Sequence, residues 1–244
     1  MRPGTRPGRI ALLAVLAAVC LATSLAARRV RGRPGRGLAA LPLVEVPSAV
    51  PGRDELAVLL TGDGGWAETD RGLSAALAKG GIPVVGWNSL RYFLRTKNPA
   101  VAARDLELIL RGYLERWHKE KAVLIGYSFG ADVIPFLANR LPPELADRVS
   151  LIVLLGPTGR ADFHFHVTSL LGKEAKDSLP SLPEIERLRG KPLLCVQGIG
   201  EKNSFCPQLP PGLAIRLIRP GGHIVNKNYG PVAAWILGPR EASH

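Results

Sequence analysis

Short apolar segments alternate with segments of helical periodicity from residue 56 onward, and this alternation restricts the fold more than any other feature of the chain. Their near-continuous apolar character is typical of strands that are covered on both faces. Because helical segments separate them, we predict an α/β fold with a mostly parallel central sheet and helices on both faces. The predicted strands are residues 56–61, 83–87, 122–126, 149–155, 192–197 and 213–218.

Helices are predicted over residues 71–79, 100–119, 129–141 and about 229–237. In the longest of them, apolar residues recur every three or four positions, as on one face of a helix. Residues 157–190 lack strong periodicity, and we interpret them as a lid or a substrate-binding excursion. Sites in parallel sheets form where strands end, so functional residues are expected in the segments that follow strands.

The N-terminus differs in character from the rest of the chain. Residues 10–27 form an uncharged apolar run that follows three arginines and ends in small residues. Residues 1–27 are therefore predicted to be a signal peptide for the periplasm or an N-terminal membrane anchor, because about 18 apolar residues just span a bilayer. Five arginines after the run conflict with export, since the positive-inside tendency keeps such a side in the cytoplasm.

Residues 28–52 are rich in Arg, Gly and Pro and are predicted to be a linker into a domain at residues 53–244. The formal net charge is +12, but residues 1–44 hold eight arginines and no acid, which leaves 24 basic and 20 acidic residues elsewhere. The body has no basic stripe interleaved with aromatic residues, so nucleic acid is not an expected partner. The Arg-rich segment beside an apolar run instead indicates an anionic membrane surface.

The most specific motif in the chain is Gly126-Tyr127-Ser128-Phe129-Gly130, which matches G-x-S-x-G. A predicted strand ends at its first glycine, and a predicted helix begins after the serine. This context is that of a nucleophile elbow, where bulk beside the serine would clash and the helix N-terminus stabilises negative charge. An ordinary strand-loop-helix connection is the alternative. We interpret the motif as an α/β-hydrolase fold with Ser128 as the nucleophile.

The triad of this fold is expected in the order serine, acid, histidine. His223 directly follows the last predicted strand and is the candidate base. Glu201 follows the strand at residues 192–197, in the sequence GIGE, and is the candidate acid that would orient the imidazole and stabilise its cation. A solvated loop glutamate beside Lys202 is the alternative for Glu201.

Residues 61–66 (TGDGGW) follow the first predicted strand of the domain, where hydrolases place a glycine-rich oxyanion loop. A backbone N–H of Asp63 or Gly64, together with that of Phe129, is expected to form the oxyanion hole. A tight turn that needs glycine is a compatible structural interpretation. The residues predicted to bind substrate are Trp66, Tyr127 and Asp132. For Asp132, in the first turn of the elbow helix, stabilisation of the helix dipole is the alternative role.

The three cysteines form no CxxC motif, and no spacing of His and Cys suits a metal ion, so no metal or cofactor is predicted. Cys195 and Cys206 lie eleven positions apart and flank a loop. In an exported protein this pair could form a disulfide. A buried strand cysteine and a separate loop cysteine are the alternative.

Five ordered stretches resemble the bacterial virulence proteins of the VirJ/AcvB family, over residues from about 56 to 237. The resemblance implies a periplasmic α/β hydrolase linked to type IV secretion and virulence, with Ser128 as nucleophile and His223 as base. It also implies an acid at the position of Asn203, where this chain carries an amide. The stretches are residues 61–70 (TGDGGWAETD), 86–99 (GWNSLRYFLRTKNP), 124–136 (LIGYSFGADVIPF), 163–167 (FHFHV) and 219–223 (RPGGH).

AcvB-like members are associated with hydrolysis of lysyl-phosphatidylglycerol, so the resemblance implies an aminoacyl ester of a membrane lipid as substrate. The lysyl group is cationic, and Asp63, Glu68 or Asp132 is a candidate partner for it. A generic carboxylesterase or thioesterase is one alternative, and a non-catalytic periplasmic binding or scaffold component of a secretion system is another. The expected partners are a lipid or small ester, an anionic membrane surface and secretion-system proteins.

Overall fold

The computed structural model describes residues 37–50, 52–95, 97–164, 178–223 and 229–238. The predicted signal peptide or anchor at residues 1–27 lies outside the described residues. Within the described residues, no helix combines the length and the apolar character needed to cross a bilayer.

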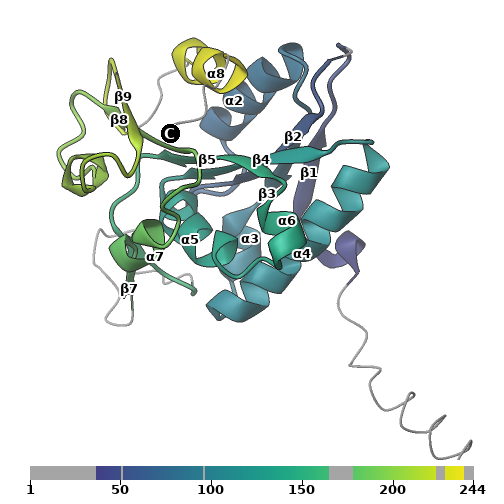
Figure 1. Ribbon diagram of the computed structural model, residues 1–244, viewed down its shortest axis with the longest axis horizontal. Coiled ribbons are helices and arrows are strands. Elements are labelled where there is room, and N and C mark those ends of the chain that lie inside the picture. The colour runs from purple at the N-terminus through teal and green to yellow at the C-terminus, as the bar shows by residue number, and fades with distance from the viewer. Residues whose placement is uncertain (1–36, 51, 96, 165–177, 224–228, 239–244) are drawn as a thin grey trace, which may run out of the picture. The chain divides into compact units, whose positions relative to one another are not determined.

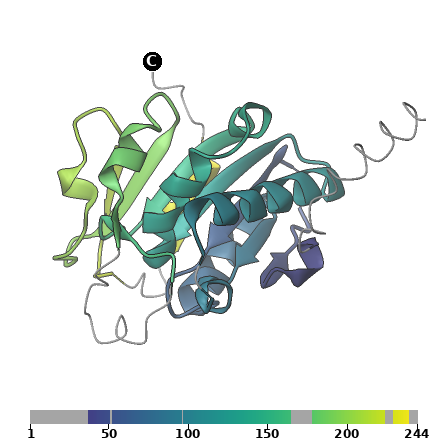
Figure 2. The same cartoon turned by 90° about the horizontal axis from the view of Figure 1, so that it is seen from below.

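Seven strands form the central sheet in the order β1-β3-β2-β4-β5-β8-β9. All neighbouring strands are parallel except β1, which runs antiparallel to β3 at one edge. Figures 1 and 2 both place β1 and β9 at opposite ends of the sheet. The six predicted strands are thus confirmed. The bounds are β1 (Leu43–Val46), β2 (Glu55–Leu60), β3 (Val84–Trp87), β4 (Lys121–Tyr127), β5 (Val149–Leu155), β8 (Leu193–Gly198) and β9 (Ile215–Arg219).

Helices cover both faces of this sheet, as the apolar strands predicted. Helices α2 (Glu68–Lys79) and α8 (Gly230–Leu237) lie on one face, and α4 (Pro99–Arg116) and α5 (Phe129–Ala138) lie on the other (Figure 1). Alternate residues of β2 enter the two hydrophobic cores, because successive strand side chains point to opposite faces. The shorter helices are α3 (Ser89–Phe93), α6 (Pro143–Ala146), α7 (Leu182–Glu186) and the 3-10 helices η1 (Leu38–Ala40) and η3 (Cys206–Gln208).

Helix α4 begins and ends where local chemistry dictates. The Asn98 side chain accepts a hydrogen bond from the Val101 N–H at 2.9 Å, and Pro99 occupies the first turn. The helix ends at Arg116, before the predicted end at residue 119, because His118 adopts a left-handed conformation with φ 51°. Such a residue is a common terminator just beyond a helix.

The predicted linker at residues 28–52 is wrong for residues 38–46, which form η1 and β1 and belong to the domain. Strand β1 pairs with β3, with Leu43 opposite Trp87. The strand was missed because it is a short, half-buried edge strand between Pro42 and Pro47, without the continuous apolar run of a central strand. The domain therefore begins earlier than residue 53.

Residues 165–177 of the predicted excursion lie outside the described residues, so the lid interpretation stays a prediction. On either side of them, β6 (Arg160–Ala161) pairs with β7 (Leu179–Pro180) in a small antiparallel sheet. Cys195 in β8 and Cys206 in η3 form a disulfide, with Cα atoms 5.7 Å apart. The bond closes the loop that carries Glu201.

Candidate active site

Ser128 occupies a sharp turn between β4 and α5, with φ 51° and ψ −116°. Positive φ is unfavourable for a residue with a side chain, so surrounding contacts must hold this conformation. The Ser128 N–H donates to the Leu155 carbonyl at 2.8 Å. A Cβ at Gly126 would lie 2.3 Å from the Gly130 carbonyl oxygen, and one at Gly130 would lie 2.2 Å from that of Leu60. The backbone packing therefore requires both glycines of the motif.

The structure brings together the three residues that the sequence assigned to a triad. His223 Nε2 lies 2.8 Å from Ser128 Oγ, and His223 Nδ1 lies 2.6 Å from Glu201 Oε1. The other carboxylate oxygen of Glu201 accepts a hydrogen bond from the Gly198 N–H at 2.9 Å. The Glu201 side chain is 5% exposed and that of His223 is 39% exposed. The acid is thus enclosed behind an imidazole that solvent can reach.

Two adjacent parallel strands, β8 and β9, carry Glu201 and His223 on the loops that follow them. The Gly200 N–H donates to the Gly221 carbonyl at 3.0 Å, which joins these loops directly. A Cβ at Gly198 would lie 2.4 Å from the same carbonyl oxygen, so the approach is possible only without a side chain. Neighbouring strands in space thus bring together residues that are 22 positions apart in the chain.

Burial raises the pKa of Glu201, but hydrogen bonds from His223 and the Gly198 N–H, and the charges of His223 and Arg219, lower it more. The pKa therefore lies below its ordinary value, and Glu201 is a carboxylate at neutral pH. Such a charge holds the adjacent imidazole in one orientation and stabilises its protonated form.

Sequence reasoning missed Arg219, the last residue of β9. Its guanidinium is buried and donates to the carbonyls of Gly222 at 2.7 Å and His223 at 3.1 Å, which fixes the loop that carries the imidazole. Burial lowers the pKa of Arg219, and the charge of Glu201 acts in the opposite direction. A charged residue in an apolar strand, next to a candidate catalytic loop, was the signal available in the sequence.

Gly156, after β5, is a second position that sequence reasoning missed. Its φ is +64°, and a Cβ there would lie 3.0 Å from both Glu201 Oε1 and His223 Nδ1. The glycine leaves room for the acid–imidazole pair. Its place directly after a predicted strand was the only signal in the sequence.

The predicted oxyanion loop packs against the elbow. A Cβ at Gly62 would lie 3.5 Å from Ser128 Cβ, and the Gly65 N–H closes a turn on the Gly62 carbonyl at 3.0 Å. Asp63 and Gly64 form the tip of this turn, and their N–H groups have no hydrogen-bond acceptor in the described part of the chain. Phe129 opens α5 directly after the serine, as an oxyanion donor would. The loop therefore offers free backbone donors close to Ser128.

Of the residues assigned to substrate binding, Tyr127 lies against the imidazole of His223, with ring centroids 5.7 Å apart. Burial raises the pKa of its phenol. Trp66 packs on β3, where a Cβ at Gly86 would lie 2.1 Å from its ring. Both side chains are half-buried, and their contact with a substrate stays a prediction.

The assignment of Asp132 to substrate binding is wrong, because the residue is 1% exposed. Its carboxylate accepts hydrogen bonds from the Thr158 N–H, the Thr158 hydroxyl at 2.7 Å and the Gly159 N–H at 2.7 Å. Burial raises its pKa to about 6, although these hydrogen bonds lower it. Asp132 thus anchors the segment that follows β5 and does not face a substrate. Its position in the first turn of a helix could not distinguish a structural role from contact with a substrate.

A cavity of about 320 Å³ opens beside the imidazole. Lys202 and Asn203 are exposed at it, so the amide at position 203 borders the cavity while Glu201 holds the imidazole. Within the described residues, no His, Cys, Asp and Glu side chains are grouped so that three could hold a metal ion. The lining residues are Thr158, Gly200, Glu201, Lys202, Asn203 and His223.

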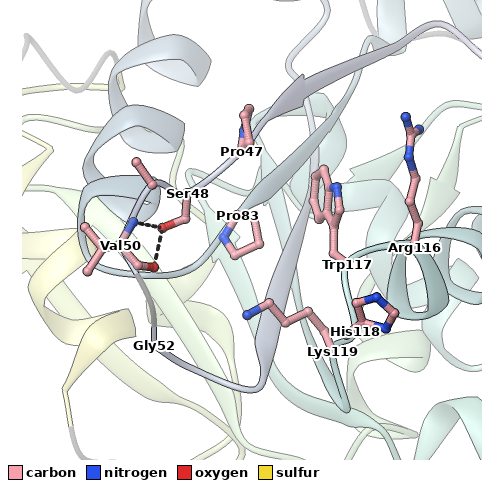
Figure 3. A pocket seen from close by; sticks show the side chains of 10 residues that line it. Pro47, Ser48, Val50, Gly52, Pro83, Arg116, Trp117, His118 and Lys119 are labelled. Carbon is pink, nitrogen blue, oxygen red and sulfur yellow. Dashed lines mark hydrogen bonds between the residues drawn. The ribbon is translucent and has the colours of Figure 1, made fainter.

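A larger cavity of about 540 Å³ lies at the amino ends of the strands, next to the segments that precede β2, β3 and β4 (Figure 3). Its basic side chains are engaged locally: Lys119 Nζ donates to the Arg53 carbonyl at 2.6 Å, and Arg116 pairs with Glu45 at 2.7 Å. Its serine, Ser48, is hydrogen-bonded to the backbone of Val50. Ser48 and His118 both line this cavity, but in the described chain no hydrogen bond joins them, whereas His223 Nε2 lies 2.8 Å from Ser128 Oγ. The candidate site is therefore the one at the carboxyl ends of the strands.

Comparisons with solved structures place this geometry in a known fold. The chain is similar to MenH from S. aureus, at 13% identity and a TM-score of 0.60, over 80% of this chain and 96% of MenH. It is also similar to TT1662 from Thermus thermophilus, at 19% identity and a TM-score of 0.58, over 83% of this chain and 96% of that one. Est1E from Butyrivibrio proteoclasticus is similar at 13% identity and a TM-score of 0.57, over 81% of this chain and 93% of Est1E. The predicted α/β-hydrolase fold is thereby confirmed.

No curated protein sequence matches the chain. The family model described as "Bacterial virulence protein (VirJ)" matches residues 54–243. That region contains the elbow, the glycine-rich loop and the paired loops of Glu201 and His223. The match agrees with the resemblance carried by the five sequence stretches, and the chain belongs to the VirJ family of bacterial virulence proteins.

Proposed function

We propose that this protein is a serine hydrolase that cleaves a carboxylic ester through an acyl-enzyme. The observation that carries the proposal is the position of His223, which bridges Ser128 Oγ at 2.8 Å and Glu201 Oε1 at 2.6 Å. A serine is a weak nucleophile unless a base accepts its proton, and an imidazole held by a carboxylate is such a base.

In the first half of the reaction, Ser128 Oγ attacks the ester carbonyl while its proton passes to His223 Nε2. Backbone N–H groups of the Asp63–Gly64 turn and of Phe129 bind the oxyanion of the tetrahedral intermediate. Glu201 stabilises the imidazolium, which then donates its proton to the departing alcohol. In the second half, water attacks the acyl-serine with His223 as base, and the acid product leaves as Ser128 regains its proton.

The proposed substrate is an aminoacyl-phospholipid such as lysyl-phosphatidylglycerol. Membership of the VirJ family supports this choice, as does the mixture of charges near the site. The cavity beside His223 contains Lys202, which would complement a lipid phosphate. Asp63, at the half-buried tip of the oxyanion loop, would complement an ammonium group. Of the three acids considered for the lysyl group, Asp132 no longer qualifies because it is buried.

The proposed location is the periplasm, with the N-terminal segment as a signal peptide or a membrane anchor. The Cys195–Cys206 disulfide supports an oxidising compartment, because disulfides persist outside the reducing cytosol. Arginines within residues 28–36 would hold the enzyme close to anionic lipid. A role beside secretion-system proteins belongs to the same proposal.

A fluorophosphonate probe tests whether the protein is an enzyme. We expect the probe to label wild-type protein and to leave Ser128→Ala unlabelled. Ser74→Ala is a matched control, because Ser74 is a buried serine in α2 whose hydroxyl has no hydrogen-bond partner in the described chain. Equal labelling of wild type and Ser128→Ala, or no labelling of wild type, would favour a non-catalytic scaffold.

The substrate class requires a second experiment. Wild type and Ser128→Ala are each incubated with vesicles that contain lysyl-phosphatidylglycerol and, separately, with a neutral acyl ester. Serine-dependent release of lysine, faster than cleavage of the neutral ester, supports the lipid assignment. Cleavage of the neutral ester alone would instead identify a generic carboxylesterase.

A further inference from the structure

Helix α3 begins at Ser89, and this residue lies directly beneath the oxyanion loop. The Ser89 hydroxyl donates to the Gly62 carbonyl and lies 2.9 Å from Thr61 Oγ1, while the Ser89 N–H donates to Thr61 Oγ1 at 3.0 Å. Thr61 is fully buried and Ser89 is 1% exposed. The three groups thus form a small hydrogen-bond network that is shielded from water.

The network has an arrangement in which every group is satisfied. The Ser89 N–H donates to Thr61 Oγ1, and the Ser89 hydroxyl donates to the Gly62 carbonyl. The Thr61 hydroxyl lies 3.0 Å from the Gly62 carbonyl oxygen and 2.9 Å from Ser89 Oγ, and it donates to one or the other. The Gly62 carbonyl also accepts a hydrogen bond from the Gly65 N–H at 3.0 Å, so at least two donors serve its two lone pairs. Rotation of this carbonyl would break these bonds in a buried place.

The direction of the Gly62 carbonyl determines the direction of the Asp63 N–H. Both groups belong to one peptide unit, and the described chain contains no cis peptide bond. In a planar trans peptide, C=O and N–H point in opposite directions. The hydrogen bonds to Gly62 pull the carbonyl toward the start of α3, and the Asp63 N–H is thereby turned away from it.

Glycine permits this conformation but does not select it. Gly62 lies against the elbow, since a Cβ there would be in van der Waals contact with Ser128 Cβ at 3.5 Å. A glycine also lets the neighbouring peptide rotate with little steric resistance. A loop of this composition needs an external restraint to hold a donor in place before the reaction, which is what oxyanion stabilisation requires.

We infer that Ser89, together with Thr61, is a positioning residue that fixes the Gly62–Asp63 peptide, so that the Asp63 N–H is held as an oxyanion donor. This inference rests on the proposed serine-hydrolase function. It identifies Asp63, rather than Gly64, as the loop's donor. Asn88, the residue before α3, also packs closely on this loop, since a Cβ at Gly65 would lie 2.9 Å from its side chain.

The test compares kcat and KM for p-nitrophenyl acetate in wild type, Ser89→Ala and the buried-serine control Ser74→Ala. Loss of one oxyanion donor lowers the rate by about 10²–10³-fold. In Ser89→Ala the Asp63 N–H should point away from the oxyanion for only part of the time, so kcat should fall by about 10- to 100-fold. KM should change little, because the ground-state ester does not depend on the oxyanion hole. Ser74→Ala should retain both constants.

A matched pair at Thr61 keeps the test informative if Ser89→Ala does not fold. Thr61→Ser retains the hydroxyl and should retain kcat, whereas Thr61→Val keeps the shape, removes the hydroxyl and should lower kcat. The rate of fluorophosphonate labelling should fall in parallel, because the phosphonyl oxygen occupies the same hole. The pH dependence of kcat/KM should stay that of wild type, since the triad is untouched.

The possible failures are distinguishable. A wild-type protein that neither hydrolyses p-nitrophenyl acetate nor accepts the probe would overturn the proposed function, and the role of Ser89 with it. An active wild type with unchanged kcat in folded Ser89→Ala, or in Thr61→Val, would overturn the positioning role alone. A loss of kcat/KM that is due entirely to a higher KM, with kcat unchanged, would also count against the positioning role.

Discussion

Glu201 Oε1 lies 2.6 Å from His223 Nδ1, and the carboxylate is enclosed while the imidazole remains open to solvent. In the proposed mechanism the acid therefore acts through the imidazole. Its second oxygen is held by the Gly198 N–H at 2.9 Å, which leaves the carboxylate little freedom to turn. A restrained charge thus orients one ring.

Replacement of Glu201 by glutamine should lower kcat by about 10²–10⁴-fold with little change in fold, because the amide has almost the same shape but no charge to stabilise the imidazolium. Steady-state kinetics with p-nitrophenyl acetate measure the effect. The control is Glu186→Gln, which changes an exposed glutamate at the end of α7 and should leave kcat unaltered. Wild-type kcat in Glu201→Gln would exclude Glu201 as the triad acid.

Gly156→Ala should abolish most of the activity, because its Cβ would lie 3.0 Å from both Glu201 Oε1 and His223 Nδ1. Gly190→Ala is a matched control: its φ is +90° against +64° at Gly156, but nothing lies within 4 Å of its added Cβ. Each variant should lose roughly 1 kcal/mol or more of unfolding free energy from the unfavourable φ. Only Gly156→Ala should lose kcat. Equal activity in the two variants would show that crowding at Gly156 is unimportant.

Asp132 should make folding stability depend on pH. Its folded-state pKa is raised from 3.8 to about 6, so the folded chain binds this proton more tightly than the unfolded chain does. The group's contribution to stability is therefore greatest below about pH 4 and falls as the pH rises to about 6, by up to roughly 3 kcal/mol. The unfolding free energy of wild type minus that of Asp132→Asn should decline over this range.

Urea denaturation at several pH values between 4 and 7 measures this difference. The control is Asp147→Asn, which removes the same charge from a side chain that is 81% exposed. A difference for Asp132→Asn that rises with pH over the same range would contradict the prediction, since it would require a lowered folded-state pKa.

The disulfide should stabilise both the domain and the loop of Glu201. It joins residues with a sequence separation of 11. The loss of chain entropy in the unfolded state predicts a stabilisation of roughly 2–3 kcal/mol for a loop of that length. Reduction by dithiothreitol, or the double variant Cys195→Ala/Cys206→Ala, should lower the denaturation midpoint by a corresponding amount. Dithiothreitol should have no further effect on the double variant. A wild-type midpoint that is insensitive to reduction would show that the bond adds nothing to stability.

The alternation of apolar strands with helices, and the spacing around Ser128, were sufficient to predict the fold and the elbow. Both are patterns within a short stretch of sequence: continuous apolar strands follow from burial on two faces, and the elbow is a five-residue motif. The contacts that require its glycines are local for Gly126, which approaches Gly130, but not for Gly130, which approaches Leu60 on the neighbouring strand. Strand β1 escaped prediction because an edge strand of four residues between prolines carries no such pattern. Its place in the sheet depends on pairing with β3, a contact across more than thirty residues.

Some residues of the candidate site could also be predicted from the sequence, and others could not. The G-x-S-x-G motif indicated Ser128, and chain order after it indicated Glu201 and His223, because each follows a predicted strand and the carboxyl ends of parallel strands lie together. Position in the first turn of the elbow helix gave Asp132 the wrong role, since burial and the hydrogen bonds from Thr158 and Gly159 are properties of packing. Arg219, Gly156 and Ser89 were not singled out for the same reason.

The sequence by itself thus determined which elements form and which strand ends carry reactive side chains, because those properties arise from periodicity and local sterics. Only the tertiary structure decided which of those side chains meet, which are enclosed and which peptide the Ser89 hydroxyl restrains. Such decisions depend on contacts between residues far apart in the chain, at distances of a few ångströms, and no local pattern specifies a distance of that kind.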